Sequence, residues 1–267
     1  MTLRIDELFT VAGKVAVVTG GSRGIGYMIA HALVENGAKV YITARKAGPC
    51  LEAAAELSTM GECIAIPGDL ATDEGRQKFV DDIKQRESKI DILVNNAGAA
   101  WGAPFESFPD DGYDKVFNIN VRAIFMLTRD LLPLLEKDAS RESPSKIINI
   151  GSIDGLRIST TDNYSYGASK AAVHHLTKNL AVRLADKGLN INAIAPGPFE
   201  SKMMAQTLKD HKERIESGIP MGRIGRPQDM GSLALFLSSP ASNYVTGQII
   251  ALDGGSNIAN AQKRTDD

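Results

Sequence analysis

Short apolar runs alternate with longer amphipathic stretches along the chain, and this alternation most narrows the folds it can adopt. The runs are rich in valine and isoleucine and nearly continuous, which is typical of strands buried on both faces of a sheet. Such alternation predicts βαβ units with right-handed crossovers. Strands are expected at 15–19, 39–43, 63–67, 92–95, 147–150, 190–194 and 248–252. Helices are expected at 24–36, 49–60, 73–87, 109–136, 164–186 and 227–237.

The pattern predicts an α/β fold, a Rossmann-like doubly wound parallel sheet of about seven strands in three αβα layers. No linker, shift of composition or internal repeat interrupts it between residues 13 and 255. We therefore expect one domain over residues 1–267, with a polar tail at about 257–267 that frays. The polar residues 138–144 are expected to form a surface loop.

A glycine-rich segment at 19–26 joins the first expected strand to the first expected helix. Glycines let a backbone turn sharply and approach phosphate oxygens, and the following helix N-terminus offers free N–H groups and a partial positive charge. An ordinary tight connection is the alternative, but the first strand–helix turn of an alternating chain is where a dinucleotide binds. The expected contacts are Gly20, Ser22, Arg23, Gly24, Ile25 and Gly26.

The end of the second expected strand favours NADP(H) over NAD(H). An acidic residue there would bind the ribose 2′-hydroxyl of NAD, but residues 41–46 contain none. Arg45 follows instead, and Arg23 lies in the glycine turn. A guanidinium binds a phosphate through two charge-assisted hydrogen bonds, so we expect both arginines to flank the 2′-phosphate. The alternative is that they are solvated surface cations.

Two further strand ends carry candidate cofactor contacts. Asp69, followed by Leu70, ends the third strand, where its carboxylate can accept from an adenine amino group or can cap the helix that starts near residue 73. Asn96, Ala97 and Gly98 end the fourth strand, where small residues and an amide would let a cofactor ring approach the backbone.

Tyr166 and Lys170 lie four residues apart in an expected helix, on one face. Tyrosine titrates at about pH 10, but a nearby ammonium stabilises phenolate. We therefore expect Lys170 to lower the pKa of Tyr166, which would then act as a general acid. Ser152 directly follows a strand, where its hydroxyl can donate to a carbonyl. Without Ser152, the pair would read as surface residues. Tyr164 is the other tyrosine available, but it has no lysine one turn later.

Asn120 and the turn at Pro196 and Gly197 complete the candidate positions. Asn120 is a polar residue within an amphipathic helical pattern, where it either faces solvent or holds a water behind Lys170. Pro196 and Gly197 follow the sixth strand and form either a plain loop or a turn on the ligand side of the sheet.

Together these motifs resemble the short-chain dehydrogenase/reductase family over residues 13–255, in the order typical of that family. The resemblance implies that Tyr166 is the acid/base and that Lys170 binds the nicotinamide ribose. It also implies that Ser152 polarises the carbonyl, that Asn120 holds a water of a proton relay, and that the backbone after Pro196 contacts the nicotinamide amide. Ser201 stands where many members have threonine, which leaves a hydroxyl for that amide.

Within the family, the segments 95–102 and 196–203 are most similar to 3-oxoacyl reductases, particularly the branch associated with rhamnolipid synthesis. The implied activity is NADPH-dependent reduction of a 3-oxoacyl thioester carried by acyl carrier protein or coenzyme A. The alternative substrate is a sugar, polyol, steroid or xenobiotic carbonyl. A more remote alternative is that the chain is a non-catalytic NADP(H) sensor. The spacing from Ser152 to Tyr166 is slightly longer than the commonest one in the family, which weakens transfer of a substrate.

Composition excludes several classes of protein. A formal net charge of −2, without blocks of like charge, argues against nucleic-acid binding. Two cysteines, no signal peptide and no apolar stretch of roughly 18 residues predict a cytoplasmic protein without a membrane segment. No metal site is expected. The resemblance implies a homotetramer built on the helices at 109–136 and 164–186, and the apolar surface of the second fits that.

Overall fold

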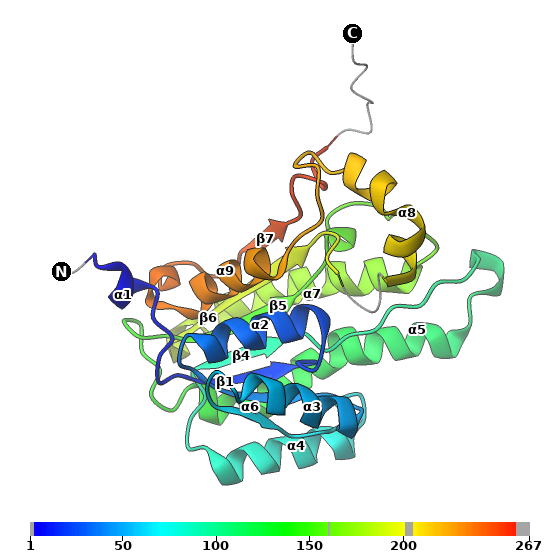
Figure 1. Cartoon of the computed structure of the whole chain (residues 1–267). Coiled ribbons are helices and arrows are strands. Elements are labelled where there is room, and N and C mark those ends of the chain that lie inside the picture. Colours follow the sequence, from blue (N-terminus) through cyan, green and yellow to red (C-terminus); the bar gives the residue numbers. More distant parts are fainter. Residues whose placement is uncertain (1–2, 160, 201–204, 260–267) are drawn as a thin grey trace.

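Seven parallel strands form the centre of the computed structural model, which describes residues 3–159, 161–200 and 205–259 (Figure 1). Ser201 and most of the tail at 257–267 therefore lie outside the described residues. The strands are β1 (Val15–Thr19), β2 (Lys39–Thr43), β3 (Cys63–Ala65), β4 (Ile92–Asn95), β5 (Ser145–Ile150), β6 (Leu189–Pro196) and β7 (Ile249–Leu252). They pair in the order β3-β2-β1-β4-β5-β6-β7, which confirms the predicted doubly wound sheet.

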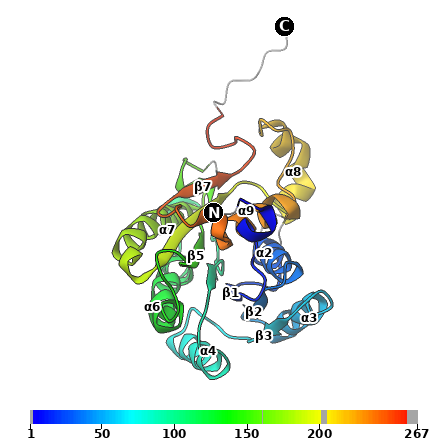
Figure 2. The same cartoon turned by 90° about the vertical axis from the view of Figure 1, so that its left-hand side faces the viewer.

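Helices cover both faces of the sheet and complete the three predicted layers (Figure 2). One face carries α2 (Gly24–Glu35), α3 (Ala47–Leu57) and α9 (Pro227–Ser238). The other face carries α4 (Asp73–Arg86), α6 (Ala123–Leu135) and α7 (Tyr164–Arg183). The remaining helices are α1 (Ile5–Leu8), α5 (Asp110–Phe117) and α8 (Ala205–Ser217), with short 3₁₀ turns at Phe105–Ser107, Ile153–Gly155, Ala185–Lys187 and Pro240–Ser242.

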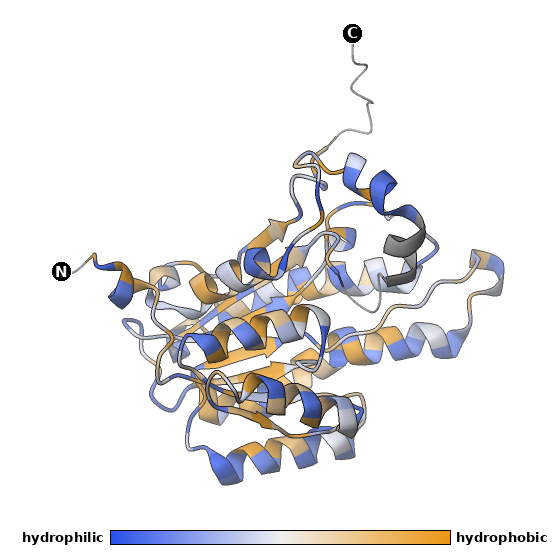
Figure 3. Ribbon diagram, viewed as in Figure 1, coloured by the Kyte–Doolittle hydropathy of each residue, from blue (hydrophilic) through white to orange (hydrophobic). Residues whose placement is uncertain are grey.

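Burial of the sheet on both faces explains why most of its strands lack polar alternation. Val18 packs with Ile29 and Leu33 in the core beneath α2, whereas Val17 packs with Leu131 in the core beneath α6. Successive side chains of a strand point to opposite faces, so each strand needs apolar residues at both parities. Figure 3 shows the result as hydrophobic strands between helices that turn hydrophilic faces outward.

The predicted helix at 109–136 is interrupted in the structure. α5 ends at Phe117, one π-helical turn spans Asn118–Arg122, and α6 then continues. π turns inside α-helices are rare and often occur at functional sites, because the wide turn redirects one side chain. Here the turn contains Asn120, whose side chain is fully buried.

Candidate functional site

The candidate residues gather at the carboxyl edge of the sheet. The strand order reverses between β1 and β4, which are neighbours in the sheet although β2 and β3 separate them in sequence. The loops that leave two such strands diverge to opposite faces, and open α/β sheets bind ligands in the resulting crevice. The glycine turn follows β1 and Asn96 follows β4, so both border this reversal.

The glycine turn has the conformation that its sequence requires. Gly20 and Gly24 have φ angles of +66° and +54°, in the left-handed region that side chains rarely adopt. A methyl group on Gly20 would lie 2.8 Å from Nδ2 of Asn96, so the turn packs directly on the residue after β4. A methyl group on Gly26 would lie closer still to the Gly20 carbonyl oxygen and to Nδ2 of Asn96, which explains the third glycine.

The N-terminus of α2 fits an anionic ligand. Its N-cap residue, Arg23, provides no side-chain hydrogen bond, and its first turn contains no acidic residue. Ser22 and Ile25 are half-buried beside it. Arg23 and Arg45 are exposed, and no carboxylate within the described residues pairs with either. These cations and free N–H groups would suit the phosphates of NADP(H).

Asn96 has a structural task that sequence reasoning missed. Its Nδ2 donates to the carbonyl oxygens of Thr19, at 2.8 Å, and Gly20, at 3.2 Å. The backbone N–H groups of Asn96 and Ala97 both donate to Oγ1 of Thr19, at 2.9 Å. The amide thus ties the glycine turn to the end of β4, which leaves Ala97 and the exposed Gly98 on the ligand side.

The structure separates the two interpretations of Asp69. Thr72 is the N-cap of α4, because its hydroxyl accepts from the N–H of Gly75 at 3.0 Å. Asp69 instead accepts from the N–H of Ala71 at 3.1 Å and remains half-buried, with Leu70 buried beneath. The capping interpretation is therefore wrong, and the adenine interpretation stays a prediction.

Ser152, Tyr166 and Lys170 come together where β5 ends and α7 begins. Nζ of Lys170 lies 5.5 Å from the centroid of the Tyr166 ring and donates to the Ile150 carbonyl at 2.7 Å. An ammonium can donate three hydrogen bonds, yet Ile150 is its one acceptor within the described residues. Lys170 is 4% exposed, and buried donors are normally paired, so its two further donors could bind a hydroxylated ligand.

The pKa of Tyr166 moves opposite to our expectation. Burial raises the pKa of Tyr166 to about 12, and the nearby Asp154 carboxylate adds to the rise, while a hydrogen bond with Ser152 acts against it. Lys170 does not lower this pKa here, because its ammonium lies over the ring face and bonds to Ile150. Burial also lowers the pKa of Lys170 to about 8. Tyr166 is therefore a neutral phenol at neutral pH, the form that donates a proton.

Asn120 does not face solvent. Its Nδ2 donates to the carbonyl of Ala99 and to Oγ of Ser169, both at 2.9 Å, while its Oδ1 accepts from the Ala99 N–H at 2.8 Å. Asn120 thus joins the loop after β4 to α7, one residue before Lys170. The solvated-surface interpretation is wrong, and the water-holding role stays a prediction.

The turn after β6 lies at the same edge. Pro196 is buried and ends the strand, and Gly197 donates to the Leu252 carbonyl at 3.0 Å. A methyl group on Gly197 would lie 2.7 Å from Cβ of Asp253, so this position excludes larger residues. Ser201, the next predicted contact, lies outside the described residues.

Sequence reasoning missed two residues near this centre, Asp154 and His174. Asp154 acts electrostatically on Tyr166. His174 lies one helical turn beyond Lys170 on α7 and is 5% exposed. The spacing of eight residues from Tyr166 to His174 could have placed it on the same helix face, but it carries no sign of burial.

His174 gives the fold an acid-sensitive element. Burial lowers the pKa of His174 from 6.5 to about 4. Between these values the unfolded chain binds a proton that the folded chain does not, so stability falls as pH falls through this interval. We expect a loss of up to about 3 kcal/mol in the free energy of unfolding, since one pKa unit corresponds to about 1.4 kcal/mol. In urea unfolding, the His174→Gln variant should lose less free energy of unfolding than the wild type between about pH 7 and about pH 4.5. Equal losses in the two proteins would contradict this expectation.

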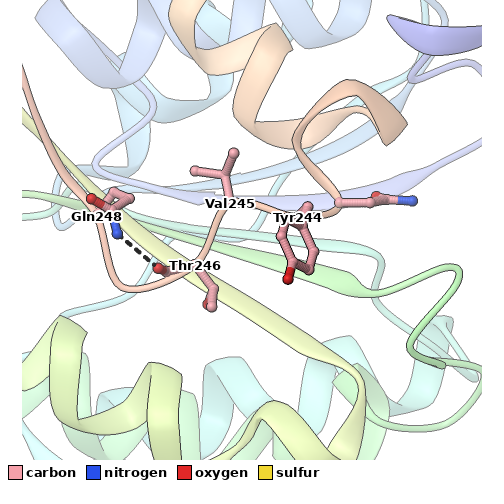
Figure 4. A pocket seen from close by; sticks show the side chains of 5 residues that line it. Tyr244, Val245, Thr246 and Gln248 are labelled. Carbon is pink, nitrogen blue, oxygen red and sulfur yellow. Dashed lines mark hydrogen bonds between the residues drawn. The ribbon is translucent and has the colours of Figure 1, made fainter.

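A cavity of about 530 Å³ elsewhere is not this site. It is lined by Asn243, Tyr244, Val245, Thr246 and Gln248, and Gln248 donates to the Thr246 carbonyl at 3.2 Å (Figure 4). These residues precede β7, so they lie at the amino edge of the parallel sheet, opposite Tyr166.

The described part of the chain contains neither a helix that could cross a membrane nor a cluster of residues that could hold a metal ion. None of its helices is long and apolar enough to cross a membrane. Across the same residues, no three histidine, cysteine, aspartate or glutamate side chains gather in a way that could hold a metal ion.

Comparisons with known proteins agree with this geometry. A family model described as enoyl-(acyl carrier protein) reductase matches residues 20–257. The chain is 46% identical over 249 residues to the rhamnolipids biosynthesis 3-oxoacyl-[acyl-carrier-protein] reductase of Pseudomonas aeruginosa, with 92% of this chain and 97% of that protein covered.

Solved structures show the same likeness. The Pseudomonas aeruginosa RhlG/NADP active-site complex matches with a TM-score of 0.91 at 46% identity, covering 94% of this chain and 98% of that one. A gluconate 5-dehydrogenase from Burkholderia cenocepacia, in complex with NADP and tartrate, matches with a TM-score of 0.88 at 30% identity, covering 96% and 100%.

Proposed function

The chain belongs to the short-chain dehydrogenase/reductase family, and from that premise we propose that it reduces a ketone to a secondary alcohol with NADPH. The observation that carries this proposal is the buried Lys170 with one protein acceptor, set against the Tyr166 ring at the carboxyl edge of the sheet. A buried cation with open donors beside a neutral phenol suits a site that binds a hydroxylated cofactor and transfers a proton.

The cofactor would lie across the carboxyl edge from the glycine turn to Lys170. NADPH supplies the hydride when bound. Arg23 and Arg45 would hold its 2′-phosphate, and the N–H groups of the turn its pyrophosphate. Asp69, Ala97 and Gly98 would border its adenosine and ribose. The free donors of Lys170 would hold the nicotinamide ribose, and the backbone after Pro196, with Ser201, its amide.

The chain's own residues account for the proton chemistry. The substrate carbonyl oxygen would accept hydrogen bonds from the hydroxyls of Ser152 and Tyr166, which stabilise negative charge as it develops on that oxygen. Tyr166 then gives its proton to the oxygen, and the alcohol forms. Asn120 holds the loop after β4 against α7 at Ser169, one residue before Lys170. We assign it the supporting, water-holding role in proton return.

The substrate class that we propose is a 3-oxoacyl thioester, carried by acyl carrier protein or coenzyme A. The 46%-identical relative named as a 3-oxoacyl-[acyl-carrier-protein] reductase supports it. The test is loss of NADPH absorbance with an acetoacetyl thioester, beside a panel of sugar and aromatic ketones. Turnover of the thioester well above the panel is the expected result. If a panel member is turned over and the thioester is not, the proposed reductase activity stands but the proposed acyl substrate class is refuted.

A sugar-acid ketone is the second candidate substrate. The similar gluconate 5-dehydrogenase, solved with NADP and tartrate, favours including 5-ketogluconate in the panel. The same residues would serve, because the proposed proton transfer does not depend on the rest of the substrate.

We also propose a cytoplasmic homotetramer built on α5, α6 and α7. Exposed apolar residues on these helices support an interface: Tyr113 is 44% exposed, Phe125 42% and Val182 79%. Burial of such side chains against a second copy would be favourable. Light scattering at micromolar concentration should give a mass near four times 28.6 kDa. A mass of one chain would refute the oligomer without affecting the proposed chemistry.

A further inference from the structure

His174 is a buried polar side chain without a role in the chemistry above. It lies on α7 at the spacing that continues the face of Tyr166 and Lys170. Neither of its ring nitrogens has a hydrogen bond of good geometry within the described residues, beyond a weak contact with the Gly155 backbone, although the side chain is only 5% exposed. Buried polar groups without partners are rare in native folds, so this imidazole calls for a specific explanation.

The ring is held between two glycines that bracket Ser152. Gly151 touches the ring so closely that a methyl group there would lie 2.7 Å from Cδ2 of His174 and closer still to Nε2. A methyl group on Gly155 would lie 2.8 Å from Cε1. Neither glycine has a positive φ, so backbone strain does not account for glycine at these positions. At Gly151 the imidazole accounts for it, whereas at Gly155 the same methyl group would also lie 2.7 Å from the backbone carbon of Lys170.

The segment between these glycines is the turn that carries the Ser152 hydroxyl. Gly151 donates to the Ile194 carbonyl at 2.7 Å, and Gly155 donates to the Ser152 carbonyl at 3.0 Å. Oγ of Ser152 accepts from the N–H of Asp154 at 3.1 Å. The imidazole therefore supports both ends of a short turn whose own hydrogen bonds set the direction of the serine hydroxyl.

We propose that His174 is a positioning residue whose ring fixes the Ser152 turn and so places the serine hydroxyl for the substrate carbonyl. The role of Ser152 in this inference rests on the proposed function. His174 acts as a neutral body of defined shape. Burial is the main cause of its lowered pKa and outweighs the contact with the Gly155 backbone, which acts in the opposite direction; the ammonium groups of Lys170 and Lys178 add to the lowering.

The first test compares the two adjacent histidines of α7. His174→Ala should lower kcat/KM for the ketone about 10- to 100-fold, because a misplacement of about 1 Å costs that much, and leave the Kd for NADPH unchanged. His175→Ala, at an exposed position, is the matched control and should change neither. If the His174→Ala variant does not fold, the His174→Gln variant replaces it in the same measurement. An unchanged kcat/KM in a folded variant at position 174 would overturn the proposal.

A double-mutant cycle asks whether His174 acts through Ser152. In a Ser152→Ala background, His174→Ala should cost less than threefold in single-turnover rate, because no hydroxyl remains to be placed. The same 10- to 100-fold loss in both backgrounds would refute the positioning role, since a general structural effect would be independent of Ser152.

A second cycle needs no activity and keeps this inference separate from the proposed function. Gly151→Ala should lower Tm in the wild-type background, where its methyl group meets His174, but much less in a His174→Ala background. Equal losses of Tm in both backgrounds would refute the packing on which the inference depends. If no ketone is turned over by the wild-type chain, the proposed function fails, whereas this cycle still reports whether the ring supports the turn.

Discussion

Tyr166→Phe is expected to lower kcat for ketone reduction about 10²–10⁴-fold, the usual contribution of a positioned general acid. The substitution removes one oxygen and leaves a ring that still fits beneath the Lys170 ammonium. The Kd for NADPH should therefore stay close to the wild-type value, which fluorescence titration can measure. The loss should appear in kcat and kcat/KM alike, because the missing interaction forms in the transition state.

The raised pKa of Tyr166 determines in which direction of the reaction the loss of kcat should be measured. With its pKa near 12, the phenol is protonated throughout neutral pH and is ready to donate. Oxidation of an alcohol would instead need phenolate, which burial disfavours. Reduction is thus the direction in which wild type and Tyr166→Phe should be compared.

Tyr164→Phe is the matched control for this experiment. Tyr164 lies two residues earlier on α7, is 47% exposed, and donates its hydroxyl to Asp162 at 3.0 Å. The same atom is removed from the same helix, so kcat should change little. If both variants retain activity, or if Tyr164→Phe alone loses it, Tyr166 is not the acid and the proposed mechanism fails.

The fold could be predicted because burial on both faces leaves a strong signal in each strand. The expected bounds of β1, β2 and β4 agree with the structure. Charged residues precede β1 and β4 directly, and Gly20 and Asn96 follow them. The shorter β3 ends at Ala65, near the sheet edge, where the pattern at 63–67 is weaker. The π turn before α6 was missed because the apolar spacing continues through it and only the buried contacts of Asn120 reveal it.

The gathering of the candidate residues at one edge could also be predicted, because parallel strands place every motif that follows a strand on the same side. The pKa shifts at the site could not be predicted from the sequence. The effect of Lys170 on Tyr166 depends on where the ammonium points, and Ile150 holds it over the ring rather than at the hydroxyl. The task of Asn96 in tying two loops together likewise depends on a contact between segments remote in sequence. The roles of these residues in catalysis and cofactor binding stay predictions.

Arg45→Asp is expected to raise the Kd for NADPH about 10- to 100-fold, because hydrogen bonds to a charged group contribute about 1.5–3 kcal/mol. The new carboxylate also repels the 2′-phosphate. The Kd for NADH should stay level or fall, since an acid at this strand end can accept from the ribose 2′-hydroxyl. Cofactor preference should therefore move toward NADH, as measured by kcat/KM with each cofactor.

The structure makes this substitution a clean probe of recognition. Arg45 is exposed and pairs with no carboxylate of the described residues, so the change should leave Tm almost unaffected. Lys78→Asp provides the control, because it makes the same change of charge at an exposed position of α4, on the opposite face of the sheet. If Lys78→Asp weakens NADPH as much, the effect is one of net charge. If Arg45→Asp weakens NADPH and NADH equally, Arg45 does not recognise the 2′-phosphate, and Arg23 alone would have to account for the preference.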